Sequence, residues 1–193
     1  ACAEESFHGV NGDKTVTMLH GSEHTYLEGE KEIGFLKSYR GGRYAFAALL
    51  PKEAGALGDY LEALTGERFL ALMQGRQSCT VQTAIPKFST DDSVQLNEIL
   101  QSLGMTAAFD FSADFTGMTE RDDLYIGQVL HKTHLELDES GTRAAAVTMV
   151  EMLAKGIFID PEQIKTVVLD RPFVYAIVDT ATGLPVFMGM LNQ

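Results

Sequence analysis

Among the residues of this chain that could support a metal site are two histidines close in sequence and two cysteines. His131 and His134 lie within a stretch whose pattern predicts a β-strand, and residues three apart in a strand point to opposite faces. They therefore cannot bind one ion. Cys2 and Cys79 match no metal-binding spacing, which predicts two free thiols. His131 falls on an otherwise apolar face, so we expect a hydrogen-bonded core histidine, no metal and no cofactor.

The acidic residues do not form a catalytic arrangement. Glu120, Asp122 and Asp123 lie in one short polar segment, and the pair Asp91 and Asp92 lies in another. Acids in such segments usually cap or solvate loops, and no general-base partner accompanies them. The phosphate-binding, nucleophile-elbow and Cys-x-x-Cys patterns are also missing from the sequence. We therefore expect that this protein is not an enzyme.

The overall charge restricts the class of partner. The 193 residues include 15 Lys and Arg against 27 Asp and Glu, which gives a formal net charge of −12 at pH 7. Such a surface repels phosphate backbones and anionic membranes. The sequence also lacks the run of about 20 apolar residues that a membrane helix needs. We expect neither nucleic acid nor a membrane as a partner.

The segment 139–156 (ESGTRAAAVTMVEMLAKG) has a pattern that fits two conformations. Helix propensity alone leaves a helix open. Read with a period of two, one face is uncharged, and it consists of Thr142, Ala144, Ala146, Thr148, Val150 and Met152. Arg143 and Glu151 both fall on the other face. The segment then reaches Lys155 and Gly156, which are typical of an exposed loop tip. This pattern predicts an element that can be a loop or a sheet strand.

The surrounding elements read as strands with a few helices. Paired glycines, Gly41 and Gly42, predict a hairpin between strands at 32–39 and 43–50. Apolar spacing predicts helices over 57–64 and 69–73, and one over 93–103 that begins at Ser93 and ends before Gly104. Further strands are predicted at 79–85, 124–138, 166–179 and 186–191. Strands and helices do not alternate regularly, which favours an α+β fold.

Several motifs, taken in order, resemble the serpin family over essentially the whole chain. The segment Glu139–Thr148 resembles the hinge of the family's reactive loop, and Leu169–Tyr175 (LDRPFVY) resembles its C-terminal signature. Further matches, in family order, are Ile85–Phe88, Leu103–Met105, Ala113–Met118, Val129–Lys132 and Phe187–Gly189.

The resemblance implies a serpin-like mixed fold rich in antiparallel β-sheet, of which residues 1–193 are the C-terminal part of a single domain. Serpins are roughly twice this length, so the absent N-terminal half is an expected partner. The resemblance places the reactive loop at about 140–165. It implies that Lys87 pairs with Glu139 and that Pro172 and Phe173 are structural. The implied hinge residues are Glu139, Gly141, Thr142, Ala144, Ala145, Ala146 and Thr148.

The resemblance also implies a function: inhibition of a target serine protease by insertion of the cleaved loop. Counting from the hinge places the reactive bond at Lys155–Gly156, which suits a trypsin-like protease. Met152–Leu153 or Phe158 would instead suit elastase-like or chymotrypsin-like targets, and counting back from Pro172 gives a bond nearer Pro161. A non-inhibitory serpin that binds or supports other molecules, or an inactive fragment, are the alternatives. The usual targets of the family imply an extracellular or periplasmic location.

Overall fold

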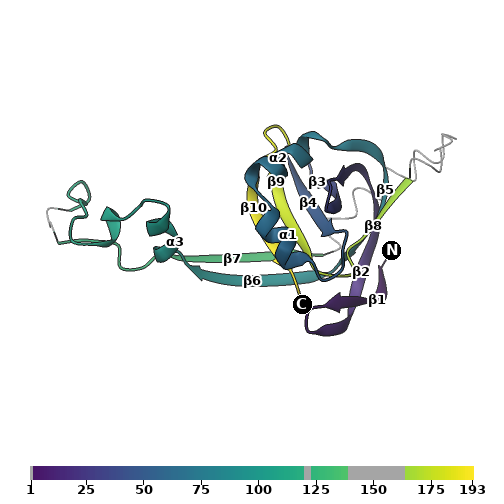
Figure 1. Cartoon of the computed structure of the whole chain (residues 1–193), viewed down its shortest axis with the longest axis horizontal. Helices are drawn as coiled ribbons and strands as arrows, with labels where there is room; N and C mark the ends of the chain where they lie inside the picture. Colours follow the sequence, from purple (N-terminus) through teal and green to yellow (C-terminus); the bar gives the residue numbers. More distant parts are fainter. Residues whose placement is uncertain (1, 120–122, 139–163) are drawn as a thin grey trace. The chain divides into compact units, whose positions relative to one another are not determined.

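The computed structural model describes residues 2–119, 123–138 and 164–193. The chain divides into two compact units (Figure 1). Unit 1 comprises residues 1–88 and 137–193, and unit 2 comprises residues 89–136. None of the described helices is long and apolar enough to cross a membrane. Cys2 and Cys79 are free thiols, as predicted.

Unit 1 is built on one eight-stranded sheet. In sheet order its strands are β10 (Pro185–Leu191), β9 (Phe173–Asp179), β4 (Tyr44–Pro51), β3 (Glu32–Ser38), β2 (Gly12–Glu28), β5 (Gln77–Pro86) and β8 (Ile164–Val168), while β1 (Cys2–Gly9) pairs with β2 outside this order. The pairings are antiparallel except that between β5 and β8, which is parallel. The prediction of an α+β fold rich in antiparallel sheet is confirmed.

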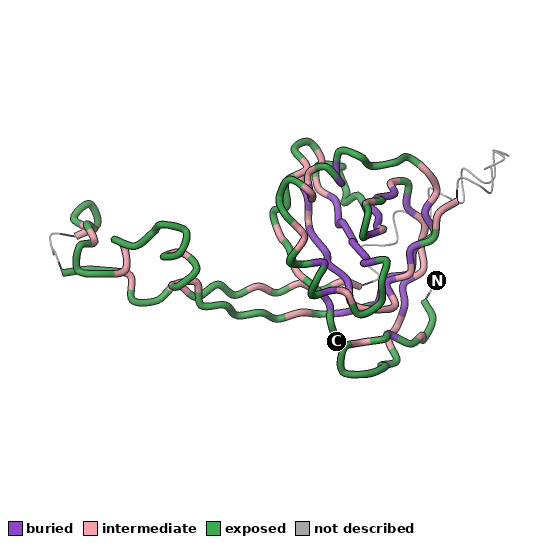
Figure 2. Tube along the Cα trace, viewed as in Figure 1, coloured by how far each residue is buried: buried purple, intermediate pink, exposed green. Residues whose placement is uncertain are grey.

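The hairpin of β3 and β4 forms as predicted. Gly41 and Gly42 both have positive φ angles, 90° and 71°, which side chains with a Cβ rarely adopt. The hairpin closes where the Tyr39 amide donates to the Tyr44 carbonyl at 2.9 Å. Every residue of β4 after Tyr44 is buried, because β4 lies centrally in the sheet between β3 and β9 (Figure 2).

Two short helices, α1 (Leu57–Ala63) and α2 (Gly66–Gln74), pack with the sheet in one hydrophobic cluster. Both confirm the helical spacing read from the sequence. The Thr65 hydroxyl caps α2 by accepting from the Arg68 amide at 3.2 Å. Burying a large apolar side chain stabilises a fold by about 1.5–3 kcal/mol, so this cluster is a major contribution. It includes Leu27, Ala45, Ala47, Leu49, Leu57, Tyr60, Phe69, Leu72, Met73, Val174, Ala176 and Val178.

An aromatic cluster surrounds Tyr175 of β9. Tyr175 stacks with Phe46 and with Phe187, at ring-centroid distances of 6.1 and 6.2 Å. Phe88 lies 5.3 Å away, also by ring centroids. On β10, Gly189 makes room for the ring, because a Cβ there would lie 2.5 Å from the Tyr175 hydroxyl. Aromatic pairs of this kind add stability beyond the area they bury.

Unit 2 differs from the sequence expectation at its element boundaries. It contains β6 (Phe88–Gln95), α3 (Asn97–Ser102), the 3₁₀ turn η1 (Ala107–Phe109) and β7 (Leu130–Leu137). The helix predicted over 93–103 is shorter, because Ser93 continues β6 instead of capping. The Asn97 side chain then fixes the start of α3 by accepting from the Val129 amide at 2.8 Å. The predicted strand at 124–138 forms only from Leu130. Gly104, with φ 99°, ends the helical region as predicted.

A charged pair lies inside unit 1. The Lys37 ammonium lies 2.7 Å from a Glu23 carboxylate oxygen, and both side chains are close to fully buried. Burial raises the pKa of Glu23, while the hydrogen bond and charge of Lys37 act in the opposite direction. Removing one partner leaves an uncompensated buried charge, whereas exposed pairs contribute little.

We expect Lys37→Met in the full-length protein to lower the free energy of unfolding by about 3–5 kcal/mol at pH 7. A carboxyl whose folded pKa is raised binds its proton more readily when folded. Its ionised form therefore lowers the free energy of unfolding, and this loss grows as pH rises from the unfolded pKa through the folded one. Removing the ammonium raises the folded pKa of Glu23 further. The deficit should therefore be largest at neutral pH and shrink once the pH falls below the ordinary pKa of a glutamate side chain.

Urea unfolding at pH 7 and at pH 4 measures this dependence. Lys52→Met is the matched control, because Lys52 and Glu28 form a longer contact of 3.5 Å and each is 38% exposed. Its expected cost is at most about 1 kcal/mol at either pH. An equal loss of stability in the two variants would contradict the role assigned to Lys37.

Candidate functional site

The candidate site is the segment between β7 and β8. The predicted hinge residues, from Glu139 to Thr148, and the predicted reactive bond at Lys155–Gly156 all lie outside the described residues. Their roles stay predictions. The described structure gives the two strands that flank the segment, β7 before it and β8 after it.

β8 attaches the downstream end to the sheet of unit 1. It pairs with β5 in parallel, from Thr80↔Ile164 to Ala84↔Val168. Among the described strands β5 is its only partner, which makes β8 an edge strand. Val167 is fully buried, and the Leu169 amide extends the ladder by donating to the Ala84 carbonyl at 2.9 Å. An exposed edge presents unpaired backbone groups that can accept a further strand.

Residues 169–172 interrupt the single strand predicted over 166–179. Pro172 lacks an amide hydrogen and precedes β9, while Arg171 turns inward. Arg171 donates to the Pro51 carbonyl at 3.0 Å and pairs with Asp170 at 3.0 Å. The Asp170 carbonyl accepts from the His8 amide at 2.7 Å. These contacts tie the segment after β8 to β1 and to the end of β4.

The structure places the two predicted signature residues at the start of β9. Phe173 is fully buried, and its ring meets that of Phe88 edge-on, with ring centroids 6.0 Å apart. Pro172 is half-buried beside it. Phe173 and Phe88 are distant in sequence, so their contact joins the start of β9 to the region where β5 ends.

Sequence reasoning missed a contact at the start of β8. The Lys165 ammonium lies 5.3 Å from the centre of the Tyr26 ring, a cation–π geometry. Burial raises the pKa of the nearby Cys79 thiol, and the Lys165 charge partly opposes this rise. The sequence does show a basic residue, Lys165, at the start of an apolar strand. It does not show that Tyr26 is the partner, because that depends on the register of β2, β5 and β8.

The upstream strand β7 belongs to unit 2, where it forms a two-stranded sheet with β6. Among the described strands β6 is its only partner. His134 of β7 pairs with Asp91 of β6 at 2.8 Å. Asp91 and Asp92 therefore lie in a strand and not in the loop that the sequence indicated.

The expectation for His131 differs from the structure. Its side chain is exposed on β7 and is not part of a core. The sheet of β6 and β7 has no second layer packed on it within unit 2. The face of β7 that alternates with apolar residues in the sequence is therefore not buried within this unit. Within the described ranges, no group of three or more His, Cys, Asp or Glu could hold a metal ion.

Lys87 lies between β5 and β6, and its amide donates to the Thr17 carbonyl at 2.8 Å. Its predicted partner Glu139 lies outside the described residues. We expect an ion pair between them in the full-length protein, with an ammonium-to-carboxylate distance below about 4 Å. A crystal structure of the intact loop measures this distance directly, and a separation well beyond this range would contradict the pairing.

Among the described residues, the strands on both sides of the segment, β7 and β8, each pair with one strand. A family model described as "Serpin (serine protease inhibitor)" matches residues 1–193. The chain belongs to the serpin family.

Curated serpin relatives match much of the chain. An uncharacterized serpin-like protein of Thermococcus kodakarensis is 33% identical over 190 residues, which cover 97% of this chain and 44% of the relative. Intracellular coagulation inhibitor 2 of Tachypleus tridentatus is 33% identical over 155 residues, which cover 80% of this chain and 37% of the relative. The chain therefore spans less than half the length of these two serpins.

Solved serpin structures give the same picture of the fold. The thermophilic serpin tengpin in its native state superposes with a TM-score of 0.85 at 40% identity, covering 100% of this chain and 50% of that one. Uncleaved ovalbumin superposes with a TM-score of 0.80 at 19% identity, covering 100% of this chain and 52% of that one, and this likeness concerns the fold alone. The described architecture is that of part of a serpin.

Proposed function

We propose that this chain is the C-terminal half of an inhibitory serpin, which traps a serine protease by inserting its cleaved reactive loop into a sheet. The observation that carries the proposal is the uncharged face from Thr142 to Met152, in a segment that follows β7. β7 has one strand partner among the described residues, so its other edge offers unpaired backbone groups. Strand addition to such an edge is a known binding mode, of which serpin loop insertion is itself an example.

The chemistry requires the protease to act first. Its serine attacks the loop carbonyl at the reactive bond, the peptide bond breaks, and an acyl-enzyme forms while the amine leaves as the new N-terminus. Insertion of the freed loop then carries the acyl-enzyme away before water can hydrolyse it. The new strand pairing supplies the driving force. The metastable starting state holds this free energy in reserve until the loop is cleaved. Small side chains such as Ala144 and Ala146 reduce the bulk that must enter.

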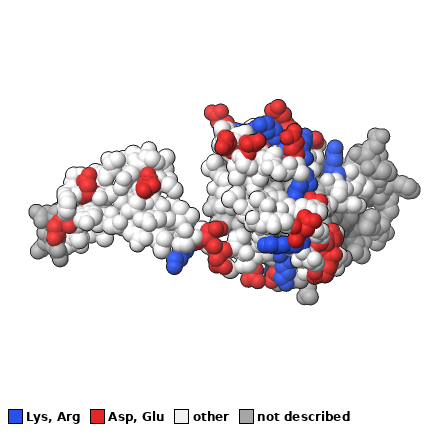
Figure 3. Space-filling model, turned by 60° about the horizontal axis from the view of Figure 1, so that its bottom comes forward, with Lys and Arg blue, Asp and Glu red and all other residues white. Residues whose placement is uncertain are grey.

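The second proposed partner is the remainder of the serpin domain. Unit 2 exposes large apolar side chains at Val94, Ile99, Leu103, Met105, Phe111, Met118, Leu124, Tyr125 and Leu130. The face of unit 2 seen in Figure 3 carries few charged side chains. An apolar surface of this extent marks an interaction site. Because the relatives are about twice as long, we propose that the absent N-terminal half covers it and completes one domain with both units.

The proposed target is a trypsin-like protease. Lys155 is the one basic residue between Arg143 and Lys165, and Gly156 follows it. A lysine side chain before the reactive bond matches a specificity pocket that carries an aspartate. Proteases of this class act mainly outside the cytoplasm, so we propose an extracellular or periplasmic location.

Incubation of the full-length protein with trypsin tests this function. We expect a complex that survives boiling in SDS, with the summed mass of trypsin and the part of the serpin that precedes the cleaved bond. Anhydrotrypsin is the control, because it binds but cannot form the acyl-enzyme. Simple cleavage without a complex would overturn inhibition and favour a non-inhibitory serpin, whereas a protein that is neither cleaved nor trapped would indicate an inactive product.

A further inference from the structure

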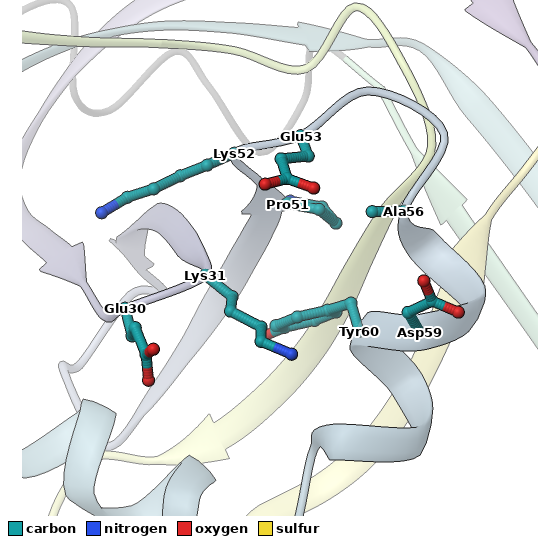
Figure 4. A pocket seen from close by; sticks show the side chains of 8 residues that line it. All are labelled: Glu30, Lys31, Pro51, Lys52, Glu53, Ala56, Asp59 and Tyr60. Atoms are coloured by element: carbon teal, nitrogen blue, oxygen red, sulfur yellow. The ribbon is translucent and has the colours of Figure 1, made fainter.

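The pocket beside α1 in unit 1 selects no class of ligand. Its rim mixes two lysines with three carboxylates, and its apolar residues Tyr60 and Pro51 are buried (Figure 4). Outside the loop, the residues with the clearest chemistry lie instead in the turn that joins β1 to β2.

This turn contains an asparagine followed by a glycine. Gly9 pairs with Gly12, so Val10 and Asn11 alone form the loop of the hairpin. Val10, Asn11 and Gly12 are all exposed. The side chain of Asn11 makes no hydrogen bond within the described residues. A carboxamide without a partner therefore lies in solvent next to the backbone nitrogen of Gly12.

Asparagine is a chemically labile residue, and these two groups react with each other. The Gly12 nitrogen attacks the Cγ atom of Asn11 and closes a five-membered succinimide ring. The side-chain nitrogen leaves as ammonia, taking the proton that the Gly12 nitrogen loses. Water then breaks one of the two ring C–N bonds, which leaves either aspartate or isoaspartate. Attack within one chain is fast, because the reacting atoms are held close together.

Gly12 favours this attack. It lacks a Cβ that would shield its nitrogen, and its φ angle of 112° lies in a region that residues with a Cβ rarely adopt. Apart from its chain neighbours, no heavy atom of the described residues lies within 4 Å of the place that a Cβ would occupy. The pairing of Gly9 with Gly12 is also the last of its ladder, and terminal pairs open readily. The ring therefore has room to form.

The chain has two other asparagines, and each lacks at least one of these features. Both ends of the Asn97 carboxamide are engaged, since it donates to the Gly127 carbonyl at 2.9 Å and accepts from the Val129 amide at 2.8 Å. Asn192 is exposed, but the residue after it carries a side chain that shields its nitrogen. Only Asn11 combines an unengaged carboxamide with a following glycine.

We propose that Asn11 is a site of spontaneous deamidation, which converts it to aspartate and isoaspartate. Isoaspartate routes the main chain through the side-chain carbon and so adds one atom to a hairpin loop of two residues. Either product adds a negative charge beside Asp13, whose carboxylate lies 2.9 Å from Nδ1 of His8. The His8 amide donates to the Asp170 carbonyl at 2.7 Å. Conversion to isoaspartate therefore loosens the contact of β1 with the segment after β8.

Prolonged incubation of the native full-length protein at physiological pH and temperature, followed by peptide mass spectrometry, tests the site. Asn11 should convert at least about tenfold faster than Asn97 or Asn192, because their engaged or shielded groups slow ring closure. Asn11→Gln is the matched variant, since it keeps a carboxamide but requires a six-membered ring. Its turn peptide should stay unchanged over the same period. A rate at Asn11 no faster than at Asn97 or Asn192 would overturn the proposal.

Amide hydrogen exchange, measured by NMR, tests the structural consequence. The isoaspartate form is separated from fresh protein by its added charge. Its His8 amide should exchange at least about tenfold faster, because the hairpin next to it no longer closes in the same register. The Val129 amide of unit 2 should exchange at an unchanged rate. Unchanged exchange at His8 would contradict this consequence. The reaction needs no protease, so its test does not depend on whether a trypsin complex forms.

Discussion

Under the proposed inhibitory function, Thr142→Arg is expected to convert this serpin from an inhibitor of its protease into a substrate of it. Thr142 begins the uncharged face of the loop, and insertion would bury the new guanidinium without a partner. Such burial costs several kcal/mol even after relaxation. Since each 1.36 kcal/mol in a barrier changes a rate about tenfold, hydrolysis of the acyl-enzyme should overtake insertion. The yield of SDS-stable complex should fall at least about tenfold, while the rate of loop cleavage stays unchanged.

Ala145→Arg is the matched control for this prediction. It introduces the same side chain nearby, but on the face that already carries Arg143 and Glu151. A strand places alternate side chains on opposite faces, so this arginine stays outside the buried side. The control should form complexes in near wild-type yield. Wild-type yield in Thr142→Arg, or equal loss in both variants, would contradict the insertion hypothesis.

Lys155→Ala is expected to abolish reaction with trypsin. At the proposed reactive bond, the lysine would supply the charge that pairs with the aspartate of the trypsin specificity pocket, and alanine would leave that aspartate without a partner. We expect the association rate to fall by at least about a thousandfold, because a site built to pair a buried charge strongly rejects a ligand that lacks it. The sequence predicts that Lys155 lies at an exposed loop tip, where a substitution changes the free energy of unfolding by only about 0.5 kcal/mol, so the thermal midpoint should stay the same.

Lys165→Ala is the control for the bond assignment, since Lys165 lies in β8 over the Tyr26 ring. It should leave the reaction with trypsin intact. Mass spectrometry of the C-terminal peptide from the trapped complex reports the bond directly. A peptide that begins at Gly156 supports the assignment. One that begins at Leu153, Ala154 or Ile159 would contradict it and favour an elastase-like or chymotrypsin-like target.

Sequence reasoning succeeded where local physics determines the element. The Gly41–Gly42 turn requires positive φ angles whatever surrounds it, so the β3–β4 hairpin was predictable. The apolar spacing of α2, Phe69, Leu72 and Met73, is its buried face, whereas in α1 Leu61 is exposed and Tyr60 is buried instead. Both cases depend on neighbouring residues alone.

It failed where distant residues decide the outcome. His131 alternates with apolar residues, yet it is exposed because β7 and β6 form a sheet without a second layer in unit 2. The break at Arg171 and Pro172 depends on a hydrogen bond to Pro51, which lies 120 positions earlier. The contact of Lys165 with Tyr26 likewise requires a parallel register between β5 and β8. None of these can be read from a local pattern.

The buried pair of Lys37 and Glu23 also bears on how this sequence can change during evolution. A lineage that lost either residue alone would pass through a protein with an uncompensated interior charge. Replacing both by well-packed apolar residues is often neutral or favourable. Inherited changes at positions 23 and 37 should therefore occur together, so that descendants keep both charges or neither.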